Sequence, residues 1–420
     1  MTTTRDPGPH HDLGEALVPP PPETADTFPL LDTLRAVGAL AVLTTHASFW
    51  AGDYTRHGTV GTLLARLDVG VAIFFVLSGF LLSRAWLLRA ADGAAAPAVL
   101  PYFWKRLLRI APIYVVTALL ALALIHQNRD HGALRWLSTL LLADTYLHDS
   151  FPAGLTHMWS LAVEVAFYLA LPALMLLLLG RGRALAVRRV VGGLVAMVAV
   201  SVWWHLDGAA RVSAGRPLEW LPAFLTWFAA GIALALLEIR HRRGQVGRLG
   251  ASLVSLARQP GSCWALVAGL MLVSATPLAG PSMLAAPTPV ESLTKHLLYA
   301  TVGLLIVLTG VFAVPSSRYA QVMGHPLGRR LGWISYGIFC LHLPILHLVM
   351  WATGWQLFVG RGPAIWALTV VLSVLAAELG YRLVERPALR LKNRFGPSAP
   401  TAPTAPAAAT TAATTGTSAT

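Results

Sequence analysis

Charged residues are scarce in this sequence. Only 12% of its 420 residues are Asp, Glu, Lys or Arg, and 55% are hydrophobic, whereas an ordinary soluble domain has about 25% charged residues. Apolar runs near or above the roughly 20 residues that a helix needs to cross a bilayer recur from residue 30 to residue 385. The composition therefore excludes an ordinary soluble enzyme and predicts an all-α, polytopic bundle of transmembrane helices.

Cysteine is almost absent. Cys263 and Cys340 are the only two, and both lie in apolar segments. Two isolated thiols provide neither a disulfide framework nor the ligand spacing of a zinc site. We therefore expect no metal ion and no bound cofactor.

Acidic residues are fewer than basic ones, 19 against 32, which gives a formal net charge of +13. Ten spans are predicted, and with both termini cytoplasmic most lysines and arginines fall on the cytoplasmic side, as the positive-inside rule requires. The positive charge then reports membrane topology and implies no nucleic acid partner. The spans are expected near residues 30–50, 69–88, 110–126, 159–179, 190–206, 218–238, 263–280, 297–314, 331–352 and 363–384.

Residues 134–148 are apolar but short, and they contain Asp144. Counting them as a span would reverse every later loop and place the basic loops outside. A re-entrant or interfacial helix is therefore predicted for this segment.

The membrane domain is predicted to cover residues 28–396. Residues 1–27 are polar and show no cleavable signal peptide. Residues 397–420 are rich in Pro, Ala and Thr, and too poor in large apolar groups to offset the entropy of ordering. Both ends are expected to be disordered and cytoplasmic.

Ionisable side chains inside a span cost roughly 2.5 to 3.5 kcal/mol, so each one is a functional candidate. In the first span, Arg35 and His46 are separated by about 16 Å along a helix and by nearly a whole number of turns. We expect them to share one face at different depths, where the arginine holds an anion and the histidine transfers a proton. The alternative for Arg35 is a snorkelling anchor, and the alternative for His46 is a histidine at the outer membrane interface.

The fourth span contains a buried carboxylate. Ser160, Glu164 and Tyr168 are spaced four residues apart, with Trp159 next to the serine. This spacing places the Glu164 carboxylate between two hydroxyls on one helix face. It indicates a polar site or, alternatively, a structural tie between helices.

A basic run, Lys105, Arg106 and Arg109, precedes the third span. The two arginines share a helix face, so their guanidinium groups can converge on phosphate oxygens. A topology anchor is the alternative.

His342, two residues after Cys340 in the ninth span, is interpreted either as a core residue or as a substrate-channel residue.

Six segments of this chain, in order, resemble the acyltransferase-3 family of integral membrane O-acyltransferases. LDTLRAVGALAVLTTH contains Arg35 and His46 at the family spacing, and Arg106 with Arg109 matches the family's RxxR element. In DVGVAIFFVLSGFLLSR, Asp68 stands before a Val-Gly pair, where the family often has Val-Asp. The other three segments are HMWSLAVEVAFYLALP, ISYGIFCLHLPIL and YRLVERPALR, which contain Glu164, His342 and Glu385.

The resemblance implies a multi-pass protein of the cell membrane that transfers an acyl group, acetyl by default, from acyl-CoA to a hydroxyl of a carbohydrate or glycosylated acceptor. It implies that His46 is the essential catalytic residue and that the basic motif handles acyl-CoA, with Arg35 helping to neutralise its phosphates. His46 is expected to act as a general base whose tautomer Glu164 fixes, if the first and fourth spans pack together.

Three alternatives stay open. His46 can itself be acylated before it passes the group on. The acceptor can be a small natural product such as a macrolide sugar. A polytopic transporter of a glycan or metabolite is the alternative from another class of protein.

Overall fold

The computed structural model describes residues 28–180 and 185–394, and within these residues it contains helices and no strand. The two ends that are predicted to be disordered, 1–27 and 397–420, lie outside the described residues. The longer helices are α1 (Pro29–Ala51), α4 (Gly70–Ala91), α5 (Val99–Leu124), α8 (Met158–Leu179), α9 (Val187–Trp203), α10 (Leu221–Arg242), α12 (Pro260–Ser274), α13 (Pro289–Val311), α15 (Pro326–Thr353) and α16 (Gly362–Gly380).

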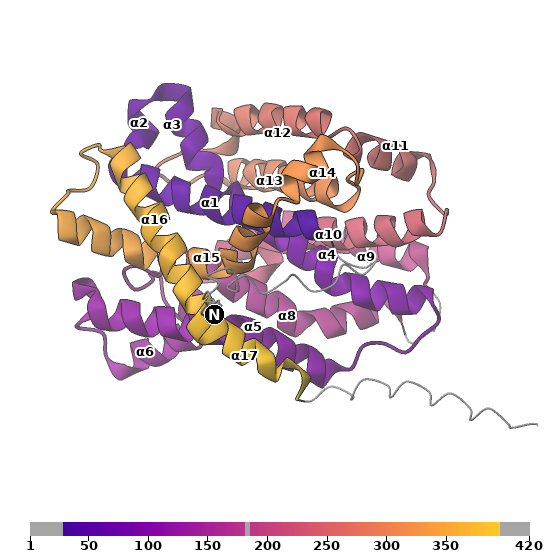
Figure 1. Ribbon diagram of the computed structural model, residues 1–420, viewed down its shortest axis with the longest axis horizontal. Coiled ribbons are helices and arrows are strands. Elements are labelled where there is room, and N and C mark those ends of the chain that lie inside the picture. The colour runs from indigo at the N-terminus through magenta and orange to yellow at the C-terminus, as the bar shows by residue number, and fades with distance from the viewer. Residues whose placement is uncertain (1–27, 181–184, 395–420) are drawn as a thin grey trace, which may run out of the picture.

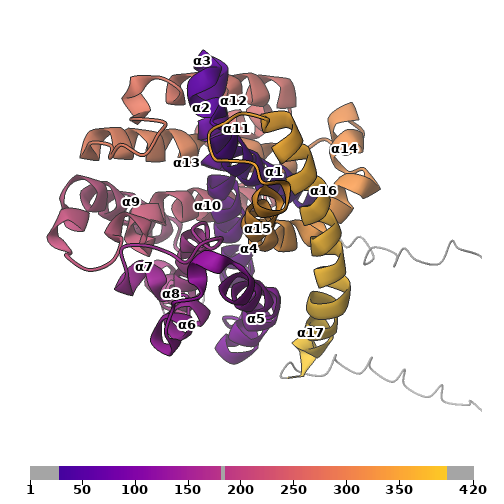
Figure 2. The same ribbon diagram turned by 90° about the vertical axis from the view of Figure 1, so that its left-hand side faces the viewer.

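Most of the long helices run side by side in the horizontal direction of Figure 1. In the turned view of Figure 2, α4 and α10 lie near the middle, with α5 and α8 on one side and α12 and α13 on the other. The shorter helices are α2 (Asp53–Arg56), α3 (Gly58–Ala65), α6 (Ala133–Leu140), α7 (Asp144–Leu147), α11 (Arg248–Ala257), α14 (Arg318–Met323) and α17 (Arg386–Arg390).

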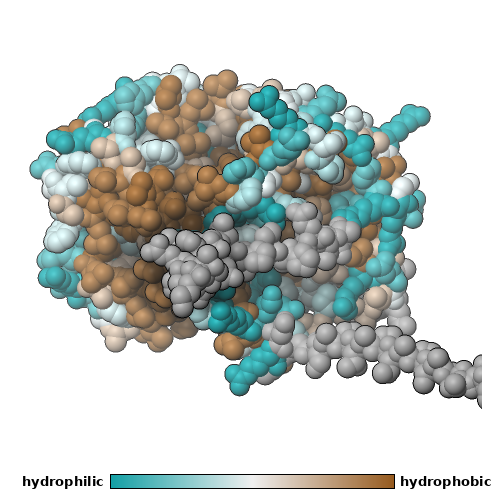
Figure 3. All heavy atoms as spheres, viewed as in Figure 1, coloured by the Kyte–Doolittle hydropathy of each residue, from teal (hydrophilic) through white to brown (hydrophobic). Residues whose placement is uncertain are grey.

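Within the described residues, eight helical stretches are long and apolar enough to cross a membrane, and each coincides with a predicted span. Hydrophobic residues cover much of the face seen in Figure 3, and hydrophilic ones gather toward its left and right edges. On α8, Leu169 and Leu177 are 64% and 68% exposed, which suits side chains that face lipid. The predicted class, an all-α membrane helix bundle, is confirmed.

The remaining two predicted spans are less apolar or shorter. α1 has 23 residues but carries Asp32, Arg35 and His46. α12 has 15 residues, a length of about 22 Å, which is less than the roughly 30 Å of the hydrocarbon core. The count of ten spans therefore stays a prediction.

Residues 134–148 form two short helices, α6 with 8 residues and α7 with 4. Neither is long enough to cross a bilayer, which confirms that this segment is not a span. Asp144 is buried at its centre, where the carboxylate accepts a hydrogen bond from Ser138 Oγ at 3.0 Å and lies 3.6 Å from Arg135 Nη1. The carboxylate that interrupts the apolar run is thus paired locally.

Glycines bring the central helices into backbone contact. A Cβ atom on Gly231 of α10 would lie 2.2 Å from the carbonyl oxygen of Val76 on α4, and one on Gly79 of α4 would lie 2.4 Å from that of Phe228. Lipid is as apolar as the helix surfaces, so helix association in a membrane depends on such close van der Waals packing. The glycines therefore hold α4 and α10 together at the centre of the bundle.

We expect Gly231→Ala to lower the stability of the bundle by about 1 to 3 kcal/mol, because the added methyl group can be accommodated only if α4 and α10 move apart. Thermal unfolding of the detergent-solubilised protein, followed by tryptophan fluorescence, measures the effect as a lower Tm. Gly269→Ala on α12 is the matched control, since a Cβ atom there meets nothing within 4 Å. Equal Tm values for the two variants would contradict the close packing.

Candidate active site

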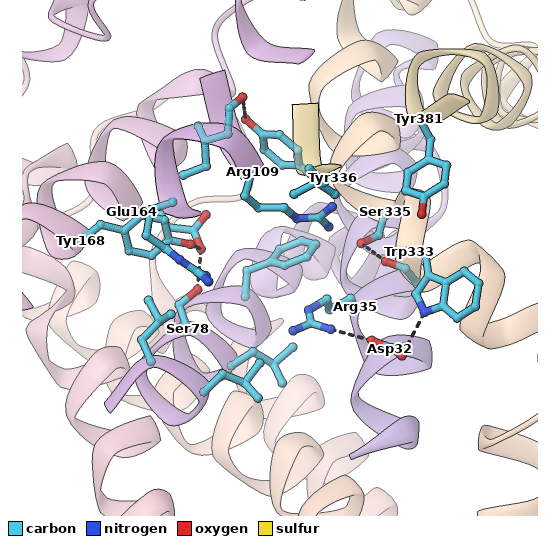
Figure 4. Close-up of a pocket in the computed structure, with 18 of the residues that line it drawn as sticks. Asp32, Arg35, Ser78, Arg109, Glu164, Tyr168, Trp333, Ser335, Tyr336 and Tyr381 are labelled. Carbon is cyan, nitrogen blue, oxygen red and sulfur yellow. Dashed lines mark hydrogen bonds and ion pairs between the residues drawn. The ribbon is translucent and has the colours of Figure 1, made fainter. Parts of the chain in front are cut away.

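Two cavities in the bundle collect most of the residues that the sequence singled out. The larger one, of about 790 Å³, is termed the basic cavity. Figure 4 shows its side chains, which come from α1, α4, α5, α8, α15 and the segment from Tyr381 into α17. Its polar lining consists of Asp32, Arg35, Ser78, Arg106, Arg109, Glu164, Tyr168, Arg330, Trp333, Ser335, Tyr336, Tyr381, Arg382 and Arg386.

Glu164 lies at one end of the basic cavity, held by two hydroxyls (Figure 4). Its Oε1 accepts hydrogen bonds from Ser78 Oγ on α4 and from Tyr168 Oη, the latter at 2.7 Å. Arg106 lies over the Tyr168 ring, with Cζ 6.0 Å from the ring centroid. The predicted pairing of Glu164 with Tyr168 is found, and Ser78 replaces Ser160 as the second hydroxyl.

Arg35 lines the same cavity from α1. Its Nη1 donates to Asp32 Oδ1 at 2.7 Å, and Asp32 Oδ2 accepts from Trp333 Nε1 of α15 at 3.2 Å. Its side chain is 29% exposed, so the guanidinium group is anchored at one edge and still open to the cavity. This geometry suits a cation that receives an anionic ligand.

Arg106 and Arg109 both line the basic cavity, as their shared helix face predicts. Arg109 Nη1 donates to Glu385 Oε2 at 3.0 Å, while Arg106 Nε is buried and has no hydrogen-bond partner among the described residues. Lys105 is exposed and does not line the cavity. The structure therefore brings two members of the basic run together with Arg35 and leaves the lysine outside.

Three further arginines complete the wall of this cavity: Arg330, Arg382 and Arg386. Arg330 and Arg382 share Glu378, each within 2.5 Å of its Oε1. Sequence reasoning counted them only as topology markers, because they lie far along the chain from the basic run. Arginine forks bind phosphate oxygens in bidentate geometry, so the cavity as a whole suits a phosphate-bearing ligand.

The second cavity, of about 310 Å³, contains His46 and is termed the histidine cavity. His46 Nδ1 lies 3.0 Å from His342 Nε2 of α15. A third ring, that of His157, lies 4.6 Å from the His342 ring between centroids and 6.2 Å from the His46 ring. Three imidazoles thus meet here: the half-buried His46 of α1 and the buried His157, which precedes α8, line the cavity, and the buried His342 of α15 lies behind them.

The hydrogen bonds of His342 determine which nitrogen of His46 carries a proton. His342 Nδ1 lies 2.6 Å from the carbonyl oxygen of Phe339, and a carbonyl can only accept, so this nitrogen is the donor. In a neutral imidazole the other nitrogen, Nε2, is then an acceptor. His46 Nδ1 must donate to it, which leaves His46 Nε2 as a proton acceptor.

The expected contact between His46 and Glu164 is not formed. The hydrogen-bond partners of Glu164 are Ser78 and Tyr168, and the group that orients His46 is His342. Glu164 lines the basic cavity, whereas His46 lines the histidine cavity. Helical spacing alone did not reveal this, because it says nothing about which helices face each other.

The rest of the predicted polar stripe on α8 lies with His46. Trp159 and Ser160 both line the histidine cavity, and Ser160 Oγ donates to the carbonyl of His157 at 3.0 Å. His342, interpreted from the sequence either as a core or as a channel residue, is fully buried and bonded to a cavity-lining histidine. It is not itself part of the cavity lining.

An ion pair also lines the histidine cavity. Asp68 Oδ2 accepts from Lys295 Nζ at 2.6 Å, and Asp68 Oδ1 accepts from the Tyr299 hydroxyl. The buried Arg66 donates from Nε to the carbonyl of Ser274, the last residue of α12, at 2.7 Å. Its Nη2 donates to the carbonyl of Gly280 in the loop before α13, and residues 281–284 of that loop line the cavity. Sequence reasoning recorded Asp68 only as part of a motif and did not single out Lys295.

A tyrosine adds a neutral hydroxyl to the same lining. Tyr54 of α2 donates from Oη to the carbonyl oxygen of Thr45 at 2.8 Å. Burial raises the pKa of this phenol above its ordinary value, so the group stays protonated at neutral pH. The histidine cavity therefore offers hydroxyl, indole, carboxylate and ammonium groups next to an imidazole.

A family model described as an acyltransferase domain matches residues 28–379, well over half of the chain. The match includes α1 through α15 and most of α16, and with them both sets of residues described above except Tyr381, Arg382, Arg386 and Glu385. The class of protein is therefore an acyltransferase whose chain is a bundle of apolar helices. The chain belongs to the acyltransferase-3 family, as its six sequence segments predicted.

Two relatives illustrate the range of this similarity. Nodulation protein 10 of Rhizobium leguminosarum bv. viciae is 26% identical over 417 residues, which cover 86% of this chain and 93% of the relative. Peptidoglycan O-acetyltransferase OatA of Listeria monocytogenes is 26% identical over 382 residues, which cover 86% of this chain and 55% of the relative. The chain thus spans about half the length of the second relative. No solved structure matches the chain.

Proposed function

We propose that this protein transfers an acyl group, acetyl by default, from acyl-CoA to a hydroxyl of a carbohydrate or glycosylated acceptor at the cell membrane. One observation carries the proposal. A cavity lined by six arginines adjoins, across the same helices, a cavity in which the Nε2 atom of His46 is a proton acceptor. A polyanionic donor and an alcohol acceptor need these two environments.

The donor belongs in the basic cavity. Coenzyme A carries several phosphate charges, and arginine holds phosphate more specifically than lysine because its fork donates two parallel hydrogen bonds. Arg106 has a buried Nε without a hydrogen-bond partner among the described residues, so a phosphate oxygen would satisfy it. Arg35, anchored by Asp32, would contribute a third cation beside Arg106 and Arg109.

The transfer step uses His46 as a general base. Nε2 takes the proton of the acceptor hydroxyl as its oxygen attacks the thioester carbonyl carbon. The carbon–sulfur bond of the tetrahedral intermediate then breaks, the thiolate of coenzyme A leaves, and the imidazolium returns the proton to sulfur. The products are the ester and coenzyme A, and His46 regains its starting tautomer.

Glu164 has a different role from the one first expected. It lies among Arg35, Arg106 and Arg109, so it would offset their repulsion and position them for the donor. His342 takes over the orientation of the base. The hydrogen bond to His342 selects the tautomer of His46 that a general base requires. The carboxylate of Ser-His-Asp enzymes has the same effect on its histidine.

The acceptor belongs in the histidine cavity, on the side assigned to the outer face by the positive-inside rule. An indole such as that of Trp159 packs against the apolar face of a sugar ring, and the Asp68 carboxylate accepts hydrogen bonds from hydroxyls. The name of one relative, a peptidoglycan O-acetyltransferase, supports a carbohydrate acceptor. The basic cavity then opens to cytoplasmic acyl-CoA.

The proposal is tested with the purified full chain in nanodiscs, radiolabelled acetyl-CoA, and chitotetraose or soluble peptidoglycan fragments as acceptors. The expected result is release of free coenzyme A together with a product that carries one added acetyl group, seen by mass spectrometry. A transporter would leave acetyl-CoA intact. Absence of coenzyme A release with every acceptor, from protein that also fails to bind coenzyme A, would overturn the proposal.

His342 provides a positioning test. His342→Leu is expected to lower kcat about 10- to 100-fold with little change in KM, because His46 then loses the acceptor that selects its tautomer. His342→Gln should retain much more activity, since the amide oxygen can accept from His46 Nδ1 while the amide NH2 donates to the Phe339 carbonyl. Equal losses in the two variants, at equal Tm, would indicate a packing role only.

A further inference from the structure

The basic cavity and the histidine cavity are separated by a partition about one helical turn thick. Four helices, α1, α4, α8 and α15, line both cavities, and on the last three a residue of one cavity is three or four positions, or about 5 Å along the axis, from a residue of the other. The pairs are Val71 and Phe74 on α4, Ser160 and Glu164 on α8, and Phe339 and Tyr336 on α15, with the histidine cavity lined by Val71, Ser160 and Phe339.

Two phenylalanine rings fill this partition. Phe74 lines the basic cavity and Phe339 lines the histidine cavity, and their ring centroids are 6.0 Å apart at an interplanar angle of 66°. Phe339 also lies against His157, with centroids 5.1 Å apart. The two rings therefore lie between the arginines and the imidazole wall.

Gly38 on α1 allows the Phe74 ring to pack closely against that helix. A Cβ atom on Gly38 would lie 3.3 Å from Cε2 of Phe74, tighter than an ordinary contact. Phe74 is only half-buried, since one side of it faces the basic cavity. The ring is thus held against α1 from one side and has open space on the other.

This arrangement matters because donor and base are on opposite sides of it, an argument that rests on the proposed function. With its phosphate groups bound by the arginines, the donor would extend its pantetheine arm and thioester toward the partition, while the proton acceptor, Nε2 of His46, belongs to the far cavity. The acyl carbon must pass the two rings to be attacked. The rest of the acyl chain, beyond the carbonyl carbon, then has to fit between the two rings.

We propose that Phe74 and Phe339 select the acyl group by its length, so that acetyl passes and longer chains are excluded. The rings touch edge to face, and each added methylene group of the acyl chain would require them to separate further. Interiors are too closely packed to accept such a group without a cost. Removing either ring creates an apolar space in the path of the chain, which a longer acyl group can fill.

The test measures the affinities of coenzyme A, acetyl-CoA and hexanoyl-CoA for the full chain in nanodiscs by isothermal titration calorimetry. The wild-type protein is expected to bind hexanoyl-CoA no more tightly than acetyl-CoA. In Phe74→Ala and in Phe339→Ala, the ratio of hexanoyl-CoA to acetyl-CoA affinity should rise at least tenfold. Each fully buried methylene group multiplies affinity roughly fourfold, and hexanoyl has four more than acetyl.

Leu81→Ala is the matched control. Leu81 lies on α4 and lines the basic cavity, as Phe74 does, but two turns further from the partition. Its truncation should leave the affinity ratio at the wild-type value. The Tm of each variant shows whether it is folded. Where an alanine variant is not folded, Phe74→Leu or Phe339→Leu takes its place.

The outcomes separate this inference from the proposed function. If coenzyme A does not bind to the wild-type protein, the donor assignment fails and the chain-length role fails with it. If coenzyme A binds and the ratio stays constant in all ring variants, only the role of the two phenylalanines is overturned. A ratio that rises equally in Leu81→Ala would also overturn it, because the chain would then lie elsewhere in the cavity.

Discussion

The His46→Ala protein is expected to lose acyl transfer by at least about a hundredfold, while it still inserts and folds. Without the imidazole the attacking hydroxyl loses the base assigned to it, and general base catalysis contributes about 10²- to 10⁴-fold. The rate of coenzyme A release in the presence of an acceptor measures the loss. The affinity for coenzyme A should stay within about twofold of the wild-type value, since the arginines are unaltered.

His347→Ala is the control for this variant. His347 is also a membrane histidine of α15, packed against Trp50 of α1 with ring centroids 4.4 Å apart, but it lines neither cavity. It should retain activity. Wild-type transfer by His46→Ala would eliminate the base, and radiolabel found covalently on the wild-type protein after incubation with acetyl-CoA alone would favour an acylated histidine.

Arg106→Ala is expected to raise the KM for acetyl-CoA about 10- to 100-fold and to change kcat little. A hydrogen bond to a charged group contributes about 1.5 to 3 kcal/mol, and this side chain presents a buried Nε that has no hydrogen-bond partner among the described residues. Steady-state kinetics with varied acetyl-CoA at saturating acceptor separates the two constants.

Two further variants sharpen this result. Arg106→Lys should recover only part of the affinity, because an ammonium group cannot replace a bidentate fork. Arg188→Ala removes an exposed arginine at the start of α9, away from both cavities, and should leave KM unchanged. A fall in kcat alone in the Arg106→Ala protein would contradict a role in donor binding.

Much of the site follows from spacing along single helices. Arg35 and His46 are separated by three turns of α1, and the structure has them lining two cavities at different depths. Arg106 and Arg109 line one cavity, as residues three apart on one helix should. Such spacing is reliable because the rise and the turn per residue are properties of the backbone itself.

Contacts between helices were beyond this reasoning. Glu164 was expected to orient His46, but Ser78 and Tyr168 hold it instead. The stripe on α8 is divided, since Ser160 lines the histidine cavity and Glu164 the basic one. Residues on one face of a helix can line two different cavities when neighbouring side chains form a partition across that face. The position of the partition depends on the neighbouring helices.

The sequence by itself determined that this chain is a helical membrane protein, that it belongs to an acyltransferase family, and that a cation and an imidazole occupy two levels of its first long helix. These properties depend on composition, motif order and local helical geometry. Only the tertiary structure decided that His342 orients His46, that arginines distant in the chain join Arg35, and that two phenylalanines separate the cavities. The rotation of each helix about its own axis is set by close packing against its neighbours, which no spacing within one helix encodes.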